Sequence, residues 1–164
     1  MKVGRGRGFT LIEMLIILAV LGILLGIAGN SMLSLRKNLT LDRAVQMIVQ
    51  DLQTCRSKSL GESRICRVKV VGASRYEVAM HNSNESNPEA LGDFCSDPDY
   101  RTPRRRSFPS GVQFQNASAG NCIAFDTRGF AYFGNTTPGI WTVANDRRSY
   151  RVIPSIVGAI KVVR

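Results

Sequence analysis

The chain has 164 residues, 44% of them hydrophobic, and a formal net charge of +10 at pH 7. The part beyond the apolar N-terminal region, about a hundred residues, suffices for one hydrophobic core but not for two. The sequence has a single histidine, no Cys-x-x-Cys pair, no phosphate-binding glycine loop and no nucleophile elbow. We therefore expect no enzyme activity, no cofactor and no metal site.

The N-terminus consists of a basic, glycine-rich segment, residues 1–8, followed by a long apolar run. Residues 14–29 are all apolar or glycine. As a helix, the stretch 9–29 would be long enough to cross a hydrocarbon core of about 30 Å. The leader contains Lys2, Arg5 and Arg7 and no acid, so the positive-inside rule keeps it cytoplasmic and directs the rest of the chain outward. We predict a membrane-spanning helix over residues 9–30.

Glu13 interrupts the apolar pattern. A carboxylate at the centre of a membrane helix costs about 2.5 to 3.5 kcal/mol on insertion scales. Either Glu13 lies close enough to the interface to reach water, or it finds a positively charged partner. An ordinary secretory signal peptide is disfavoured, because residues 26–29 are only a weak substitute for a cleavage site.

Residues 7–15, Arg-Gly-Phe-Thr-Leu-Ile-Glu-Met-Leu, resemble the class III signal of type IV pilins and pseudopilins, which a prepilin peptidase cuts after the glycine. The resemblance implies that Gly8 is the last leader residue and that Phe9 becomes the N-methylated N-terminus. It also implies that Glu13 neutralises the N-terminal amine of a neighbouring subunit during assembly. Such an ion pair would favour assembly, because removing one partner of a buried ion pair costs about 3 to 5 kcal/mol.

Residues 31–60 continue as an amphipathic helix with one apolar stripe at helical spacing. The stripe comprises Leu41, Ala44, Val45, Ile48, Leu52 and Cys55. We predict one long helix from about residue 10 to residue 60, ended near Gly61 and packed by its second half on a globular head. The alternative is a separate helix after a hinge at residues 29–30.

After Gly61 the period changes to that of strands. Residues 65–71 and 76–80 predict a hairpin, and residues 81–109, rich in Asn, Ser, Asp, Pro and Arg, predict a long loop. Further strands are predicted at 112–115, 122–126, 131–133, 141–143, 150–153 and 159–163, with turns at 126–129 and near 138–139.

This order of elements resembles the α+β pilin fold, a long N-terminal helix packed on an antiparallel β-sheet head. Residues 122–129 resemble the central Phe-Asp-x-x-Gly hairpin of the GspH/FimT group of minor pseudopilins and minor pilins. Residues 150–163 resemble that group's C-terminal strand pair around a glycine turn; ordinary hairpin chemistry is the alternative for both matches. The expected division is a leader (1–8), a membrane and filament-core helix (9–30), an amphipathic half-helix (31–60) and a β-rich head (61–164).

All four cysteines lie on the exported side, where an even number favours disulfides. Four cysteines allow three pairings, and sequence does not choose among them. We expect Cys55 with Cys66 and Cys95 with Cys122. The only histidine, His81, lies in a polar stretch, and we expect it to be exposed and inert.

Basic residues crowd the end of the long loop and the C-terminal strands. The candidates are Arg104, Arg105, Arg106, Arg147, Arg148, Arg151, Lys161 and Arg164. Such clusters can neutralise the phosphates of DNA, although a solvated basic face or an acidic neighbour in a filament explains them equally well.

The resemblance implies a minor pilin or pseudopilin that enters a type IV pilus or a type II secretion pseudopilus. Implied partners are other pilin subunits, the prepilin peptidase, the inner-membrane assembly platform and, before assembly, membrane lipid. The implied location is the inner membrane, crossed once, with the head in the periplasm or outside the cell, and then the filament. The alternative function is DNA uptake in natural transformation through the basic head surface.

Overall fold

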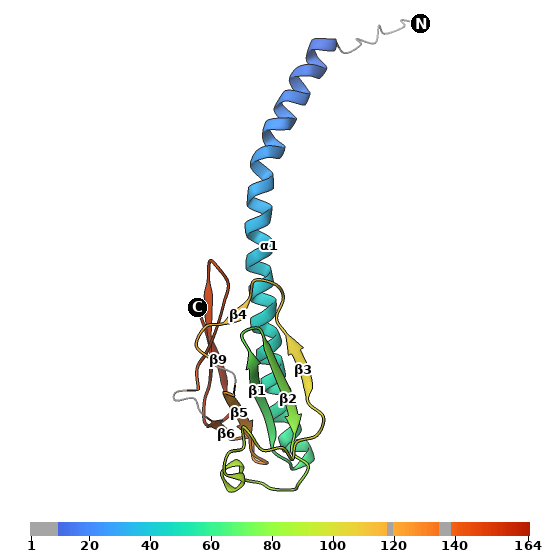
Figure 1. Ribbon diagram of the computed structural model, residues 1–164. Coiled ribbons are helices and arrows are strands. Elements are labelled where there is room, and N and C mark those ends of the chain that lie inside the picture. Colours follow the sequence, from blue (N-terminus) through green and yellow to red (C-terminus); the bar gives the residue numbers. More distant parts are fainter. Residues whose placement is uncertain (1–9, 118–119, 135–138) are drawn as a thin grey trace, which may run out of the picture. The chain divides into compact units, whose positions relative to one another are not determined.

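The computed structural model describes residues 10–117, 120–134 and 139–164, without the side chains of residues 27–34. Helix α1 (Leu11–Glu62) is followed by short antiparallel strands (Figure 1). The chain forms two compact units, Met1–Lys37 and Asn38–Arg164, and α1 contributes to both. The helical backbone is continuous through residues 29–30, so the predicted single helix is confirmed.

The first part of α1 exposes its apolar side chains on all sides. Every side chain from residue 10 to residue 26 is exposed, including Leu11 (79%) and Leu25 (67%). No helix among the described residues is long and apolar enough to cross a membrane.

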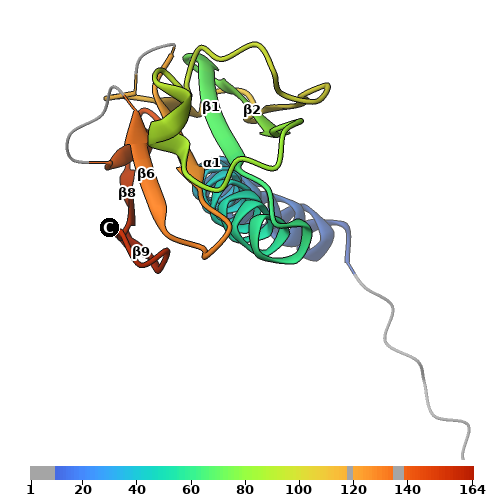
Figure 2. The same cartoon turned by 90° about the horizontal axis from the view of Figure 1, so that it is seen from below.

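The second part of α1 carries the apolar stripe predicted from the sequence, and this stripe is buried. Leu41, Ile48 and Leu52 are fully inaccessible to solvent. They pack with Tyr76, Trp141 and other strand residues in the main hydrophobic core. Figure 2 shows the strands lying to one side of this part of α1. The helix therefore anchors the head through one face and leaves the opposite face to solvent.

The C-terminus of α1 lies at Glu62, next to the predicted Gly61. Gly61 is still helical, and the left-handed conformation that ends the helix is taken by Ser63, with φ of 50°. The Arg64 N–H donates to the carbonyl oxygen of Ser59 at 3.3 Å, which closes the last turn. The helix therefore ends within one residue of the predicted position, and its last turn closes with a serine rather than a glycine in the left-handed conformation.

The described strands are antiparallel, as predicted, and they form two sheets. The first has the order β3-β2-β1-β5-β6 and comprises β1 (Cys66–Gly72), β2 (Arg75–Met80), β3 (Arg104–Ser107), β5 (Cys122–Phe125) and β6 (Ala131–Gly134). The second has the order β4-β7-β8-β9 and comprises β4 (Gln113–Phe114), β7 (Trp141–Ala144), β8 (Ser149–Pro154) and β9 (Ile160–Val163). The predicted hairpin is present as β1 and β2.

An aromatic cluster joins the two sheets beneath α1. Phe114 on β4 contacts Tyr76 on β2, with ring centroids 6.3 Å apart, and Trp141 on β7, at 5.8 Å. Phe108 packs against Tyr76 and Phe114 at 5.6 and 4.8 Å. Because these rings come from both sheets, the main core extends across both of them. A second, smaller cluster contains Ile65, Phe94, Cys95, Cys122 and Ala124.

Strand β3 lies inside the segment 81–109 that the sequence predicts to be a loop. Its residues are Arg-Arg-Arg-Ser, and it pairs with β2 at the edge of the five-stranded sheet. Arg105 lies opposite Glu77, an attractive cross-strand pair. An edge strand that buries no apolar face has no alternating hydrophobic pattern, so periodicity cannot detect it. The same segment contains a short 3-10 helix, η1 (Pro88–Leu91).

Candidate functional site: the helix N-terminus and the packing of the head

Thr10 caps the N-terminus of α1. The Glu13 N–H donates to the Thr10 carbonyl oxygen at 3.1 Å and to Thr10 Oγ1 at 3.3 Å. A threonine followed three residues later by glutamate is the spacing of a capping box. This local signal is present in the sequence and was not used in the prediction. Gly8 and Phe9, the predicted cleavage and methylation residues, lie outside the described part of the chain.

Glu13 lies in the first turn of α1 and is exposed. A negative charge is favourable there, because unpaired N–H groups give a helix N-terminus a partial positive charge. Glu13 makes no ion pair with any other residue that the structure describes. Its carboxylate is therefore available to a cation from another molecule. The Glu13 N–H is thus part of the helix cap, and the carboxylate is exposed in the first turn.

Arg56 on α1 connects two hairpin turns at the end of the head where α1 stops. Its Nε donates to the carbonyl oxygen of Gly129 at 3.1 Å, and its Nη2 donates to that of Val157 at 2.9 Å. Gly158 packs so closely that an added Cβ would lie 2.4 Å from both Arg56 Nε and the Gly129 oxygen. The two glycine turns that the sequence singled out are thus held together by one side chain, which no sequence signal indicated.

Asp126 explains the Phe-Asp-x-x-Gly pattern. Its carboxylate is completely buried and accepts hydrogen bonds from the N–H groups of Arg128 and Phe130 at 2.9 and 2.8 Å. Gly129 follows with φ of 80°, a conformation that favours glycine. The Arg128 side chain also pairs with Asp126, at 3.1 Å. These residues shape the β5–β6 turn and stabilise it.

Two disulfides join Cys55 to Cys66 and Cys95 to Cys122. This is the pairing expected from the sequence. The first connects α1 to the start of β1, and the second connects the segment after η1 to β5. Gly134 on β6 faces the second disulfide, and an added Cβ there would lie 2.0 Å from Cys95 Sγ. Both bridges are buried.

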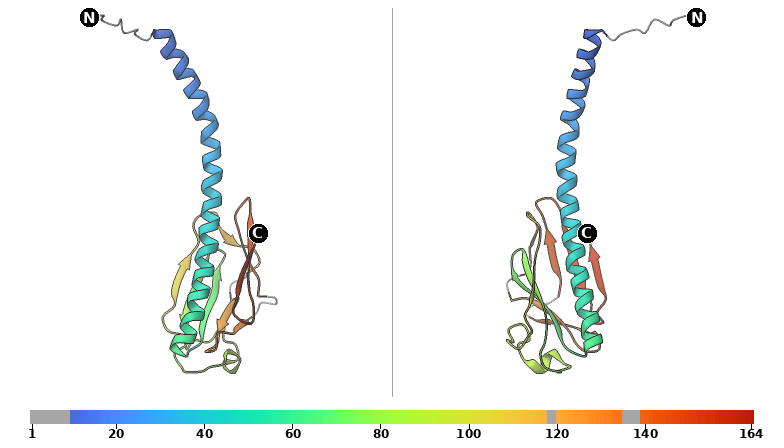
Figure 3. Two further views of the ribbon diagram at one scale, coloured as in Figure 1. Left: turned by 180° about the vertical axis from the view of Figure 1, so that it is seen from behind. Right: turned by 90° about the vertical axis from the view of Figure 1, so that its right-hand side faces the viewer.

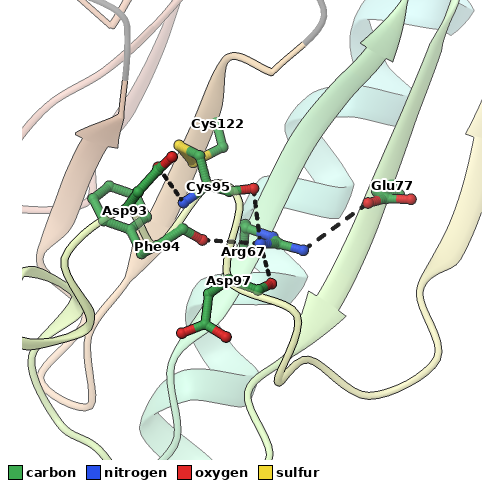
Figure 4. The surroundings of a disulfide bond; sticks show 7 residues. All are labelled: Arg67, Glu77, Asp93, Phe94, Cys95, Asp97 and Cys122. Carbon is green, nitrogen blue, oxygen red and sulfur yellow. Dashed lines mark hydrogen bonds and ion pairs between the residues drawn. A yellow bond between two sulfur atoms is a disulfide. The ribbon is translucent and has the colours of Figure 1, made fainter.

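A buried arginine reinforces the segment around Cys95 (Figure 4). Arg67 Nη1 donates to the carbonyl oxygens of Phe94 and Cys95 at 2.9 and 3.0 Å. Its guanidinium lies over the Tyr100 ring, 3.7 Å from the centroid, and its Nη2 is 4.0 Å from Glu77. Burial lowers the pKa of Arg67, and the neighbouring acidic groups oppose this effect. Arg67 and the disulfide thus fix the same segment independently.

His81 is buried, contrary to the expectation of an exposed residue. It is 2% exposed, and its ring meets the Tyr100 ring edge-on at 4.9 Å. Its Nδ1 accepts from the Ser83 N–H at 3.2 Å, and its Nε2 lies 3.5 Å from Asp97 Oδ2. The polar sequence around His81 misled the prediction, because the segment 93–100 folds over it through tertiary contacts.

The predicted DNA-binding residues fall into two groups on different sheets. The first group lies on β3 and comprises Arg104, Arg105 and Arg106. The second group lies in the four-stranded sheet and next to it: Arg147 and Arg148 between β7 and β8, Arg151 on β8, Lys161 on β9, and Arg164 after β9. Strands β3 and β9 lie on opposite sides of α1 (Figures 1 and 3). Arg106 is also neutralised by Asp51 at 3.2 Å, which in turn accepts from the Tyr76 hydroxyl at 2.7 Å. The structure does not bring these residues together into one basic surface.

Residues 4–29 match the family model described as the prokaryotic N-terminal methylation motif. The fold is similar to that of the type IV minor pilin FimU of Pseudomonas aeruginosa PAO1, with a TM-score of 0.53 and 12% identity, covering 78% of this chain and 91% of FimU. It is also similar to the minor pseudopilin EpsH from the Type 2 Secretion System of Vibrio cholerae, with a TM-score of 0.51 and 11% identity, covering 74% of this chain and 94% of EpsH. No curated protein sequence matches the chain significantly.

At these identities the structural similarity shows the fold, and the N-terminal methylation motif is an independent match over residues 4–29. The two similar structures are those of a type IV minor pilin and a minor pseudopilin. The predicted pilin fold and the predicted likeness to the GspH/FimT group are therefore confirmed. The chain therefore combines a prokaryotic N-terminal methylation motif with a fold similar to that of a type IV minor pilin and a minor pseudopilin.

Proposed function

We propose that the protein is a low-copy subunit that is cleaved after Gly8 and enters a thin filament, a type IV pilus or a type II secretion pseudopilus, through the first half of α1. The methylation motif covers both the predicted cleavage site and the apolar run. The basic, bulky head is consistent with a minor subunit.

The observation that carries this proposal is the exposed apolar surface of residues 11–26. Leu11, Ile12 and Leu25 are each at least two-thirds exposed, and the surface extends around the helix rather than along one stripe. A helix that is hydrophobic on all sides needs an apolar environment on all sides. Lipid would supply it before assembly, and the helices of neighbouring subunits would supply it in the filament.

Glu13 would fix the position of this segment along the helices of neighbouring subunits. In lipid its carboxylate is costly, whereas beside the N-terminal amine of a neighbouring subunit it forms an ion pair. The proposed partners are therefore other pilin subunits, with the prepilin peptidase and the inner-membrane assembly platform acting before them. The proposed location is the inner membrane, with the head on the outer side, followed by the filament.

The test separates the charge of Glu13 from its place in the helix cap. Glutamine at N3 of a capping box still reaches the cap, so Glu13→Gln removes the charge and keeps the capping group. Glu13→Ala removes both. We expect both variants to be processed normally and to be depleted from sheared filaments by at least about tenfold, as loss of a charged partner predicts.

The readout is the ratio of processed protein in the filament and membrane fractions. Thr10→Ala serves as the matched control, because it weakens the helix cap and leaves the charge in place. Normal incorporation of Glu13→Gln would show that the carboxylate charge is not used in assembly. Normal incorporation of Glu13→Ala as well would exclude any role of this side chain.

A further inference from the structure

A groove runs between the solvent-exposed flank of α1 and strand β9. Its volume is about 560 Å³. Its floor is apolar, from Val45, Val49 and Val162, and glutamine side chains of α1 border it. The remaining lining residues are Asp42, Gln46, Gln50, Gln53 and Tyr150. All of these residues belong to the head unit, so the groove is a feature of the head alone.

Strand β9 borders this groove with an open edge. It pairs only with β8, with Val162 opposite Val152 and Lys161 opposite Ile153. The turn is closed by the Ser155 N–H donating to the Ala159 carbonyl oxygen at 2.7 Å. Hydrogen-bonded pairs alternate along an antiparallel ladder, so Lys161 faces β8, whereas the N–H and C=O groups of Ile160 and Val162 point away from it. Neither residue has a further hydrogen bond within the described part of the chain.

The surroundings of the groove are basic. Its one acidic lining residue, Asp42, accepts a hydrogen bond from the Tyr150 hydroxyl at 2.8 Å. This hydrogen bond raises the pKa of Tyr150, and the positive charges of Arg164 and Arg148 oppose the rise, so both arginines lie near the groove. Both are exposed. The charge next to the open edge is therefore positive, and the acid that could balance it is already engaged.

These features together specify an occupant. Unpaired N–H and C=O groups at a sheet edge recognise the backbone of an extended chain, and pockets beside the edge select its alternate side chains. The valines accept apolar side chains, the glutamine amides can both donate and accept hydrogen bonds, and the arginines favour acidic groups. We propose that β9 binds an extended, acidic segment of another protein, which adds a fifth strand to the four-stranded sheet beside α1.

This inference goes beyond assembly through the N-terminal helix and does not depend on it. The probe is a synthetic peptide that alternates valine with glutamate, added to the full chain in mild detergent. Binding is followed by fluorescence anisotropy and by hydrogen exchange of the segment 159–164. We expect saturable binding, slower exchange at Ile160 and Val162, and no binding of the same peptide with lysine in place of glutamate.

Val162→Pro is the decisive variant, because it removes the outward N–H at a position that makes no hydrogen bond to β8, and proline is tolerated on edge strands. It also replaces the valine side chain that lines the groove, a change for which an alanine variant controls. Leaving a peptide carbonyl unpaired should weaken binding by about tenfold. Val162→Ala, which keeps the N–H, is the matched control and should change binding by less than about threefold. Trp141 fluorescence checks that each variant is folded.

A second measurement does not rely on any variant of the protein. Peptides N-methylated at every second residue should lose binding in one register and keep it in the other, because only one set of N–H groups faces β9. Equal binding of Val162→Pro and Val162→Ala, equal effects of the two methylated registers, or unchanged exchange at saturating peptide would overturn the proposal. So would displacement of the acidic peptide by duplex DNA, since that would make the basic rim a phosphate site.

Discussion

Replacing Gly158 by alanine is expected to destabilise the head by about 3 kcal/mol, because this glycine lets two turns close on Arg56. Gly158 has φ of 78°, and an added Cβ would lie 2.4 Å from the Gly129 carbonyl oxygen and from Arg56 Nε. The left-handed conformation costs an alanine about 1 kcal/mol. The turn must also move away from Arg56, and the two hydrogen bonds of Arg56 are lost or stretched.

The loss of those two hydrogen bonds accounts for the rest of the expected destabilisation. Arg56 donates to Gly129 at 3.1 Å and to Val157 at 2.9 Å; both bonds are charge-assisted, the first is partly buried and the second is exposed to water. About 1 kcal/mol each is appropriate for such bonds. Together with the backbone term this gives about 3 kcal/mol, which lowers the melting temperature of a protein of this size by roughly 6 to 12 °C.

Gly111→Ala is the matched control. Gly111 has φ of 81°, close to that of Gly158, but an added Cβ would meet nothing within 4 Å. It should cost only the backbone term, about 1 kcal/mol. Thermal unfolding of the full chain in mild detergent can be followed by the fluorescence of Trp141, which is fully buried. Equal destabilisation by the two variants would refute the claim that close packing around Arg56 stabilises the two turns.

Two further predictions concern the disulfides and a buried tyrosine. Replacing both cysteines of Cys95–Cys122 by serine should destabilise the folded state by about 3.5 kcal/mol, and the same change at Cys55–Cys66 by about 2.8 kcal/mol, because the closed loops span 27 and 11 residues. Denaturation of the two double variants compares these losses. The reverse order would contradict the loop-length argument. Burial raises the pKa of Tyr100 to about 12. In the unfolded chain the Tyr100 phenol loses its proton near pH 10, so the stability that it contributes is present below pH 10 and is lost as the pH rises towards 12. Tyr100→Phe should therefore weaken the pH dependence of the free energy of unfolding between pH 10 and 12. An unchanged pH dependence would argue against a buried phenol.

The sequence predicted the elements that bury an apolar face. The stripe from Leu41 to Cys55 has the period of a helix, and its burial follows directly from that period. Strands β1, β5, β7 and β8 likewise contain buried side chains and bounding turns, and each lies close to its predicted range. The glycine turns were found because Gly129 and Gly158 occupy left-handed positions that favour glycine.

The features that the sequence did not reveal depend on tertiary contacts. Strand β3 is polar and pairs on one side only, so it has no hydrophobic period. Arg56 and Arg67 are bound through backbone carbonyl oxygens far away in sequence, and a carbonyl oxygen is present at every residue and leaves no pattern. His81 is buried by a segment rich in turn residues, which a reading of local polarity assigns to the surface.

The N-terminal site is the reverse case, because the sequence says more about it than the structure does. It was predicted from a short sequence motif, and the predicted cleavage and methylation residues, Gly8 and Phe9, lie outside the described residues. What the structure adds is the cap at Thr10 and the exposure of Glu13 and of the apolar side chains that follow. The proposed ion pair of Glu13 with a neighbouring subunit is tested by Glu13→Gln, which removes only the charge.

The most direct test of the account is the mass of the mature N-terminus, measured by intact-protein and peptide mass spectrometry on the protein isolated from its native cells. The account predicts a chain that begins at Phe9, with a methyl group on its α-amine and without residues 1–8. An intact leader would contradict it, because no free amine would then lie near Glu13 in the assembled filament. Cleavage after the apolar run near residues 26–29 would also contradict it, because it would remove Glu13 itself.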